Sequence, residues 1–234
     1  MSKEQFVYEP GLYVVPTPIG NLEDITIRAL RLFSAAEIIA CEDTRVTGQL
    51  LKQYSITPQK LYSCREHNEK EASTFLCDQV KKGSRVCYVS DAGTPGISDP
   101  GSILIQTAIT ECIPYFVLPG ATALIPALIQ SGFDCSIWTF VGFPPHKKGR
   151  ESFLKHVSQM NQTVIMYESP HRIKELISDF ASHPIFQHKT MYLIREISKK
   201  FEQAYRGKPS DISLSLNASS AKGEFVLVIS GGEV

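Results

Sequence analysis

Residues 85–118 read RVCYVSDAGTPGISDPGSILIQTAITECIPYFVL, and this stretch decides the fold. Residues 85–90 form an apolar run that predicts a buried strand, and residues 103–110 carry a helical pattern. Residues 114–118 predict a second strand. A strand, a helix and another strand in succession form the unit from which parallel sheets with helices on their faces are built.

The same alternation extends back to the start of the chain. Strands are expected at residues 12–15, 37–41 and 61–62, and helices at residues 25–33, through Leu50 and Leu51, and at residues 69–82. Because helices separate the successive strands, the strands are expected to lie parallel in one sheet. The first half therefore predicts a mainly parallel sheet with helices on both sides.

The second half has more strands per helix. Strand-like runs occupy residues 138–141, 163–167, 189–197, 203–206 and 225–230, with only three helical patterns between them. One of these patterns is an apolar stripe with helical spacing, formed by Ile173, Leu176, Ile177 and Phe180. More strands per helix predicts a mixed sheet. We therefore expect two α/β domains, residues 1–119 and residues 120–234.

Composition narrows the function. The chain has 234 residues, 43% of them hydrophobic, and 24 basic residues balance 24 acidic ones. A formal net charge of zero excludes a basic nucleic-acid coat protein and an acidic disordered tail, but it leaves RNA binding by a local patch open. The six cysteines show no Cys-x-x-Cys spacing, so we expect neither a metal site nor a redox dithiol.

The protein is expected to be cytoplasmic and to have no membrane span. Residues 1–4, MSKE, contain no apolar signal segment. The longest uncharged stretch, residues 112–133, is interrupted by Pro114, Pro119 and Pro126, which do not suit a spanning helix. The cysteine usage also fits a reducing compartment.

The loop at residues 90–101 contains more groups able to bind a ligand than any other stretch of the sequence. It is too long and too rich in Gly and Pro for a plain connection. Its glycines let the backbone approach a ligand, and its hydroxyls and carboxylates can form hydrogen bonds. The alternative is a structural loop capped by Asp99. In either case Asp99 before Pro100 predicts the start of the next helix, with Asp99 as its cap. The same pattern at Ser169 and Pro170 predicts another helix start.

Two further loops follow predicted strands, at residues 16–21 and 119–123. Because parallel strands end at one edge of their sheet, all three loops could line the same crevice. The sequence lacks the glycine fingerprint of Rossmann dinucleotide sites, the P-loop, the nucleophile elbow of α/β-hydrolases and the HExxH zinc motif. These absences argue against those four kinds of site.

Several polar clusters remain, and three of them have two interpretations. Residues 42–45 (EDTR) either form a helix cap with first-turn acids or act in catalysis. Residues 65–69 (REHNE) either hold a substrate or start a solvated helix. Residues 146–150 (HKKGR) either contact phosphate or are simply solvated. Residues 168–172 (ESPHR) combine a cap with a His and an Arg.

Together these motifs resemble the small-subunit ribosomal RNA methyltransferases of the tetrapyrrole (corrin/porphyrin) methylase superfamily. The match covers nearly the whole chain, and its most specific segments are residues 90–101 and 168–172. The matching segments are TPIGNL (17–22), DIT (24–26), CEDTR (41–45), EHNE (66–69), SDAGTPGISDPG (90–101), GF (142–143), KKG (147–149), YESPHR (167–172), RE (195–196), KKFE (199–202) and KGEF (222–225).

The resemblance implies S-adenosylmethionine as cofactor, bound in the cleft between the two domains. It also implies 2′-O-methylation of a cytidine in the decoding region of 16S rRNA, in the 30S ribosomal subunit, by a homodimer. One motif departs from the family, since PGATA at residues 119–123 replaces the usual Pro-Gly-Pro-Ser-Ala. By matching motifs, the implied cofactor-binding residues are Pro18, Ser90, Asp91, Ala92, Gly93, Thr94, Ile97, Thr122, Ala123 and Tyr167.

Methyl transfer from a sulfonium is an in-line displacement, and alignment of donor and acceptor lowers its barrier. A ribose hydroxyl is a poor nucleophile, so a general base would increase the rate. Our hypothesis is that Glu42, Asp43 or His67 takes the proton. For RNA, we expect a basic patch. Its candidate residues are Arg28, Arg45, Lys147, Lys148, Arg150, Arg172, Lys199 and Lys200.

Two alternatives remain open from the sequence. One is a methylase of the same fold that acts on a small tetrapyrrole, whose carboxylates would also suit a basic cleft. The other is a non-catalytic protein that keeps the cofactor pocket as a sensor. Methyl transfer to 30S subunits or to porphyrinoid acids distinguishes the two enzymes, whereas binding without transfer indicates the sensor.

Overall fold

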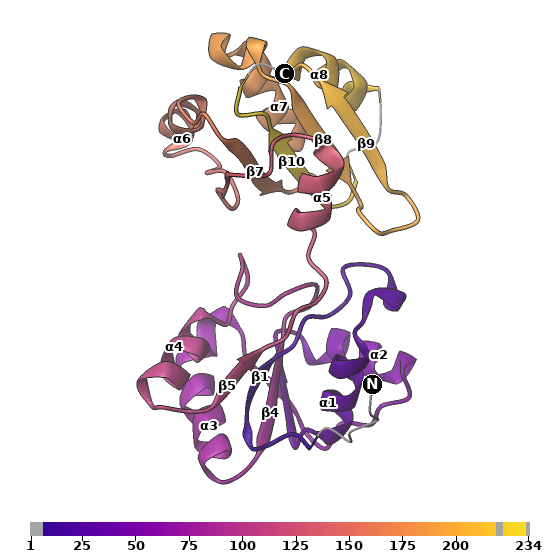
Figure 1. Cartoon of the computed structure of the whole chain (residues 1–234), viewed down its shortest axis with the longest axis vertical. Coiled ribbons are helices and arrows are strands. Elements are labelled where there is room, and N and C mark those ends of the chain that lie inside the picture. Colours follow the sequence, from indigo (N-terminus) through magenta and orange to yellow (C-terminus); the bar gives the residue numbers. More distant parts are fainter. Residues whose placement is uncertain (1–6, 219–221, 233–234) are drawn as a thin grey trace. The chain divides into compact units, whose positions relative to one another are not determined.

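The computed structural model describes residues 7–218 and 222–232 (Figure 1). The chain divides into two compact units, Met1–Thr122 and Ala123–Val234. Each unit has its own five-stranded sheet and its own hydrophobic core. Within the described residues, no helix is both long and apolar enough to cross a lipid bilayer.

The sheet of the first unit has the strand order β3-β2-β4-β1-β5, and every neighbouring pair is parallel. Its strands are β1 (Gly11–Val14), β2 (Ile38–Cys41), β3 (Leu61–Ser63), β4 (Arg85–Val89) and β5 (Tyr115–Val117). Its helices are α1 (Ile27–Ala35), α2 (Thr44–Gln53), α3 (Glu69–Lys81) and α4 (Ser102–Thr110), with short 3-10 helices η1 (Leu22–Asp24) and η2 (Glu66–Asn68). The parallel sheet expected from the alternating pattern is confirmed.

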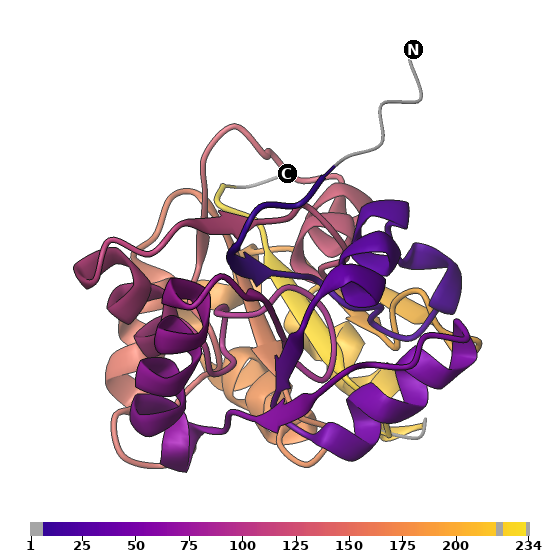
Figure 2. The same ribbon diagram turned by 90° about the horizontal axis from the view of Figure 1, so that it is seen from below.

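Helices cover both faces of this sheet, because successive side chains of a strand point to opposite sides. Leu12 and Val14 of β1 pack in one cluster with Leu76 of α3 and Leu104 of α4. Tyr13 lies between them in sequence and packs on the other face, in a cluster that includes residues of α1 and α2. Both views show the two helix layers on either side of these strands (Figures 1 and 2).

The sheet of the second unit has the order β6-β7-β10-β8-β9 and is mixed, as the sequence predicts. The pair β6–β7 is parallel, whereas the other three pairs are antiparallel. Its strands are β6 (Trp138–Phe140), β7 (Thr163–Glu168), β8 (Met191–Arg195), β9 (Gln203–Gly207) and β10 (Phe225–Ile229). Its helices are α5 (Leu124–Ser131), α6 (Arg150–Ser158), α7 (Ile173–Ser182) and α8 (Pro209–Asn217), with the 3-10 helix η3 (Pro184–His188).

The core of the second unit lies between its sheet and the helices α6, α7 and α8. The predicted stripe of α7 is fully buried in this cluster, from Ile173 to Phe180. Met191 and Leu193 of β8 point into the same cluster, so Tyr192 between them points to the opposite face. There its hydroxyl donates a 2.8 Å hydrogen bond to the side chain of Gln130 on α5. Helix α5 therefore covers the second face.

The two helix starts predicted at Asp99-Pro100 and Ser169-Pro170 are wrong. Helix α4 begins at Ser102, after Gly101, and α7 begins at Ile173, after Arg172. In the second case residues 169–172 form a turn, and the backbone carbonyl of Ser169 accepts the N–H groups of Arg172 and Ile173 at 3.1 Å each. In the first case a carboxylate from another helix supplies the cap.

Candidate active site

The loops that follow the five strands of the first unit all leave the same edge of the sheet, because the strands are parallel. We call this edge the carboxyl edge. Most of the predicted catalytic and cofactor-binding residues lie in its loops. The loops are residues 15–21 after β1, 42–43 after β2, 64–65 after β3, 90–101 after β4 and 118–123 after β5.

Three of these loops are joined by hydrogen bonds. Thr17 and Gly93 exchange two backbone hydrogen bonds, with N to O distances of 2.9 and 3.1 Å. The Thr17 hydroxyl also donates to the carbonyl of Ser90 at 3.3 Å. The Thr94 hydroxyl donates to the carbonyl of Ala121 at 2.9 Å. The loops after β1, β4 and β5 therefore form one connected surface, as their common edge predicts.

Two glycines allow these loops to pack against each other. Gly93 has a φ of +84°, and a Cβ atom there would lie 3.2 Å from Cγ2 of Ile19. A Cβ atom on Gly120 would lie only 2.5 Å from Cβ of Pro16. The sequence predicts that the glycines of residues 90–101 let the backbone approach a ligand. At Gly93 the closest neighbour within the protein is a side chain of another loop.

The loop of residues 90–101 is anchored at its far end by Glu69, which is 4% exposed. Its Oε1 atom accepts the backbone N–H groups of Gly101 at 2.8 Å and Ile103 at 2.9 Å, so it caps α4 from α3. The two interpretations of residues 65–69, a substrate clamp and a solvated helix start, both miss this role. The helical spacing of the sequence could have indicated this role. Glu69 lies on the same face of α3 as the buried Ala72 and Leu76, which predicts that Glu69 is buried too.

Asp43 serves as the N-cap of α2. Its Oδ1 atom accepts the backbone N–H of Arg45 at 2.8 Å, and its Oδ2 atom lies 2.6 Å from Nη2 of the same arginine. The backbone N–H of Asp43 donates to Oδ1 of Asp91 at 3.1 Å. Hydrogen bonds from Arg45 hold the pKa of Asp43 well below its usual range. A carboxylate with so low a pKa is a weak base.

Glu42 and His67 differ from Asp43 in their surroundings. Glu42 is partly buried, and burial raises the pKa of its carboxyl, with further contributions from the negative charges of Asp91 and Asp99. His67 lies exposed on η2. Of the two candidate carboxylates, Glu42 therefore has the greater affinity for a proton at neutral pH.

The predicted cofactor residues are distributed over both units. Pro18, Ser90 and Gly93 are buried in the joined loops, whereas Asp91, Ala92 and Ile97 are exposed there, and Thr94 and Thr122 are half-buried. Ala123 and Tyr167 belong to the second unit, directly before α5 and on β7 respectively. The structure thus brings together those predicted cofactor residues that belong to the first unit.

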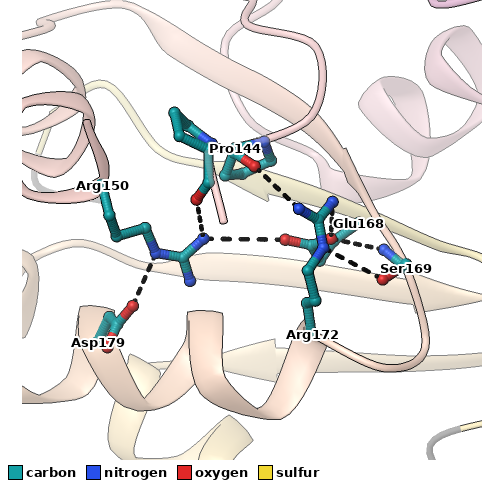
Figure 3. A network of polar contacts seen from close by, with 7 residues as sticks. Pro144, Arg150, Glu168, Ser169, Arg172 and Asp179 are labelled. Carbon is teal, nitrogen blue, oxygen red and sulfur yellow. Dashed lines mark hydrogen bonds and ion pairs between the residues drawn. The ribbon is translucent and has the colours of Figure 1, made fainter. Parts of the chain in front are cut away.

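In the second unit, two of the predicted RNA-binding arginines are engaged with protein carboxylates (Figure 3). Arg172 Nη2 lies 2.8 Å from Oε1 of the buried Glu168, and Arg150 Nη1 lies 4.0 Å from Oε2 of the same residue. Arg150 also donates from Nε to Asp179 at 2.8 Å. Both arginines further donate to backbone carbonyls, Arg150 to Pro145 at 3.0 Å and Arg172 to Pro144 at 3.3 Å.

The other predicted RNA-binding residues are more accessible, with one exception. Lys199 is held between Glu196 and Glu224, at 2.9 Å from an oxygen of each. Arg45 is exposed but paired with Asp43. The remaining four side chains are exposed and belong to Arg28, Lys147, Lys148 and Lys200. In the described part of the chain, no group of three His, Cys, Asp or Glu side chains is placed to hold a metal ion.

The two units and their sheets define a known class of protein. Residues 11–213 match the family Tetrapyrrole (Corrin/Porphyrin) Methylases. The fold is similar to that of a diphthine synthase, with a TM-score of 0.71, 14% identity and coverage of 93% and 88% of the two chains. It is also similar to uroporphyrin-III C-methyltransferase from Thermus thermophilus complexed with S-adenyl homocysteine, with a TM-score of 0.62, 15% identity and coverage of 94% and 97%. The chain belongs to the tetrapyrrole methylase family.

Curated relatives within that family specify the branch. A protein of Hydrogenobaculum sp. (strain Y04AAS1) is 46% identical over 94% of this chain and 95% of its own length. One of Halalkalibacterium halodurans is 41% identical over 94% of this chain and 75% of its own length. Both are named ribosomal RNA small subunit methyltransferase I. The resemblance predicted from the sequence motifs is confirmed.

Proposed function

We propose that this protein transfers the methyl group of S-adenosylmethionine to the ribose 2′-hydroxyl of a cytidine in the decoding region of 16S rRNA. The observation that carries the proposal is the 40–46% identity to curated rRNA small subunit methyltransferase I proteins over most of the chain. The alternatives of a tetrapyrrole substrate or a non-catalytic sensor have weaker support. The uroporphyrin-III C-methyltransferase is only 15% identical and shares the fold alone.

The residues of the carboxyl edge fit the chemistry of the cofactor. Ile97 exposes 47% of its surface and offers an apolar contact for an adenine ring. Asp91 is an exposed carboxylate near the partly buried Glu42, so the edge is acidic where a cationic sulfonium needs a counter-charge. Thr94 and Ser90 add hydroxyl groups. Ala123 and Tyr167 remain contacts implied by the family motifs.

The chain's own residues then have two tasks, orientation and proton removal. The bound cofactor supplies an activated methyl group and a neutral thioether leaving group. The joined loops after β1, β4 and β5 form a rigid support, so they orient the reactants at little entropic cost. We assign the general base to Glu42, because its raised pKa suits proton abstraction better than that of Asp43.

We assign the contacts with RNA to exposed basic side chains. A chain with a net charge of zero needs a local patch to hold a polyanion. Lys147 and Lys148 are exposed on the loop before α6, whereas Arg150 and Arg172 hold Glu168. We therefore assign direct phosphate contacts to the two lysines and a supporting role to the arginines. We further propose that the protein acts as a homodimer on the 30S subunit in the cytoplasm.

The decisive experiment is methyl transfer with labelled S-adenosylmethionine. The acceptors are 30S subunits from cells that lack the protein, deproteinised 16S rRNA and a porphyrinoid acid. We expect label in the 30S subunits, at a ribose that becomes resistant to alkaline cleavage. Label in the porphyrinoid acid would establish the tetrapyrrole alternative. Cofactor binding in calorimetry without transfer to any acceptor would establish the sensor.

A further inference from the structure

Three aromatic rings gather on the second unit, and one of them, Phe143, precedes the basic loop at residues 146–148 in the sequence. The Phe143 ring is tilted at 56° to the Tyr167 ring, with centroids 5.7 Å apart. Tyr167 in turn meets Phe140 edge-on at 5.0 Å. Phe143 exposes 48% of its surface, whereas the other two rings are half-buried. An exposed ring backed by other rings offers a flat, apolar surface to a ligand.

The backbone that carries Phe143 is fixed on both sides. Before it, the carbonyl of Gly142 accepts the N–H of Tyr167 at 3.1 Å, and Gly142 turns the chain with a φ of +66°. After it, Arg172 and Arg150 hold the carbonyls of Pro144 and Pro145 (Figure 3). The arginines are held in turn by the buried Glu168 and by Asp179.

This arrangement explains what Arg150 and Arg172 do for binding without touching a ligand. Their ion pairs fix the loop between β6 and α6, so the exposed ring of Phe143 loses little freedom when a ligand covers it. A preorganised surface binds more tightly mainly because it loses less conformational entropy when the ligand binds. The arginines are therefore positioning residues, and Phe143 is the contact that they position.

The charges beside the ring select the class of ligand. His146, Lys147 and Lys148 follow within a few residues of Phe143 and are all exposed. An aromatic face with neighbouring lysines is the arrangement that binds single-stranded nucleic acid, in which a base stacks and phosphates pair with cations. The adenine of S-adenosylmethionine would also fit the ring, but the whole cofactor suits the lysines less well. It has no phosphate, and its sulfonium and ammonium groups outweigh its single carboxylate.

We propose that Phe143 stacks on an unpaired base of the RNA substrate, while Lys147 and Lys148 contact the adjacent phosphates. The inference deepens the proposed function and rests on it for the identity of the RNA. The resemblance to known methyltransferases gave the GF segment at residues 142–143 no role of its own. Here it becomes the base-stacking element of the second unit.

The test compares Phe143→Ala, Phe143→Trp and Leu214→Ala. Leu214 is an exposed apolar residue on α8, so its replacement is a matched control for the removal of apolar surface. Loss of one stacking contact is expected to raise the KM for 30S subunits, and the Kd for a fluorescent single-stranded oligocytidine, about tenfold in Phe143→Ala. Phe143→Trp restores both values, and Leu214→Ala leaves them unchanged. Because Phe143 packs on Tyr167, any loss of calorimetric S-adenosylmethionine affinity in Phe143→Ala is expected to be smaller than the loss of RNA affinity.

The lysines give an independent readout. Replacing Lys147 and Lys148 by Ala is expected to flatten the dependence of log Kd on log salt by about 0.7 for each phosphate of the single strand that the protein no longer neutralises. Phe143→Ala keeps the wild-type salt dependence, because stacking releases no counterions. Circular dichroism and thermal unfolding check that each variant is folded. If Phe143→Ala does not fold, Phe143→Trp provides a second test.

Three results would overturn the inference. They are unchanged RNA affinity in Phe143→Ala, equal loss of RNA and S-adenosylmethionine affinity, and absence of oligocytidine binding by the wild-type protein. Failure of the proposed function looks different, because it is the absence of methyl transfer to 30S subunits by the wild type. Binding of oligocytidine that depends on Phe143 would then still support the stacking surface.

Discussion

Oε1 of Glu69 on α3 accepts the backbone N–H of Gly101 at 2.8 Å, across 32 positions of sequence. The same oxygen also accepts the N–H groups of Ile103 at 2.9 Å and Leu104 at 3.4 Å. One buried carboxylate thus satisfies the otherwise unpaired donors at the start of α4. It also fixes the end of the loop at residues 90–101, which carries most of the predicted cofactor contacts.

Glu69→Ala is expected to lower the free energy of unfolding by about 1–3 kcal/mol, because it leaves buried N–H groups without an acceptor. Glu69→Gln keeps a carbonyl oxygen and should lose less. Urea denaturation measures both. Glu71→Ala is the matched control, since Glu71 is an exposed acid in the same first turn of α3. A loss as large in Glu71→Ala would mean that helix charge, and not the cap, is responsible.

Glu42→Gln is expected to reduce kcat about 10²–10⁴-fold, because an amide cannot take the proton of the acceptor hydroxyl. The wild-type rate should fall as the pH drops through a pKa above the ordinary glutamate value, since burial favours the protonated, inactive carboxyl. Asp43→Asn is the control and should keep this acidic limb. An unchanged pH–rate profile in Glu42→Gln would remove Glu42 as the base and leave His67 to be tested in the same way.

The fold could be predicted from sequence because its signals are local. The apolar spacing from Ile173 to Phe180 depends only on the period of a helix, and the structure buries that stripe completely. The strand runs are local in the same sense. Parallel pairing then follows from the intervening helices, and it places the three Gly- and Pro-containing loops at one edge.

The details of the candidate site could not be predicted because they depend on distant partners. The cap of α4 comes from Glu69, so the local pattern Asp99-Pro100 gave the wrong helix start. The sequence likewise indicated that Arg150 is free to bind phosphate, but its partner Asp179 lies on a different helix. Whether an arginine pairs with a carboxylate of the protein or with a phosphate of the ligand depends on tertiary packing.

Glu37→Gln is expected to lower stability at neutral pH by about 0.5–1 kcal/mol, a small effect because both partners are one-third exposed. Hydrogen bonds from Arg85 hold the pKa of Glu37 below its usual value, including one from the Arg85 backbone N–H at 2.7 Å. A lowered carboxyl pKa stabilises the fold above the unfolded value of about 4.3, and this stabilisation is lost as the pH falls through the folded value.

Urea denaturation at several pH values between 7 and the acid transition measures this contribution. The difference between wild type and Glu37→Gln should shrink toward zero in acid. Glu23→Gln removes an exposed carboxylate from η1 and controls for net charge. If the Glu37→Gln difference stays constant across the pH range, the ion pair with Arg85 is not its source.

Gly120→Ala tests whether the joined loops of the carboxyl edge support cofactor binding. The added Cβ atom would lie 2.5 Å from Cβ of Pro16, so the loops after β1 and β5 must move apart. We expect a loss of about 1–3 kcal/mol in stability and weaker S-adenosylmethionine binding in calorimetry.

Gly48→Ala is the control, because its Cβ would meet Leu61 at an ordinary 3.7 Å. Alanine in α2 should add up to about 1 kcal/mol of stability. Cofactor affinity that survives Gly120→Ala at a temperature where the variant is fully folded would show that contact between these two loops is not needed to hold the methyl donor.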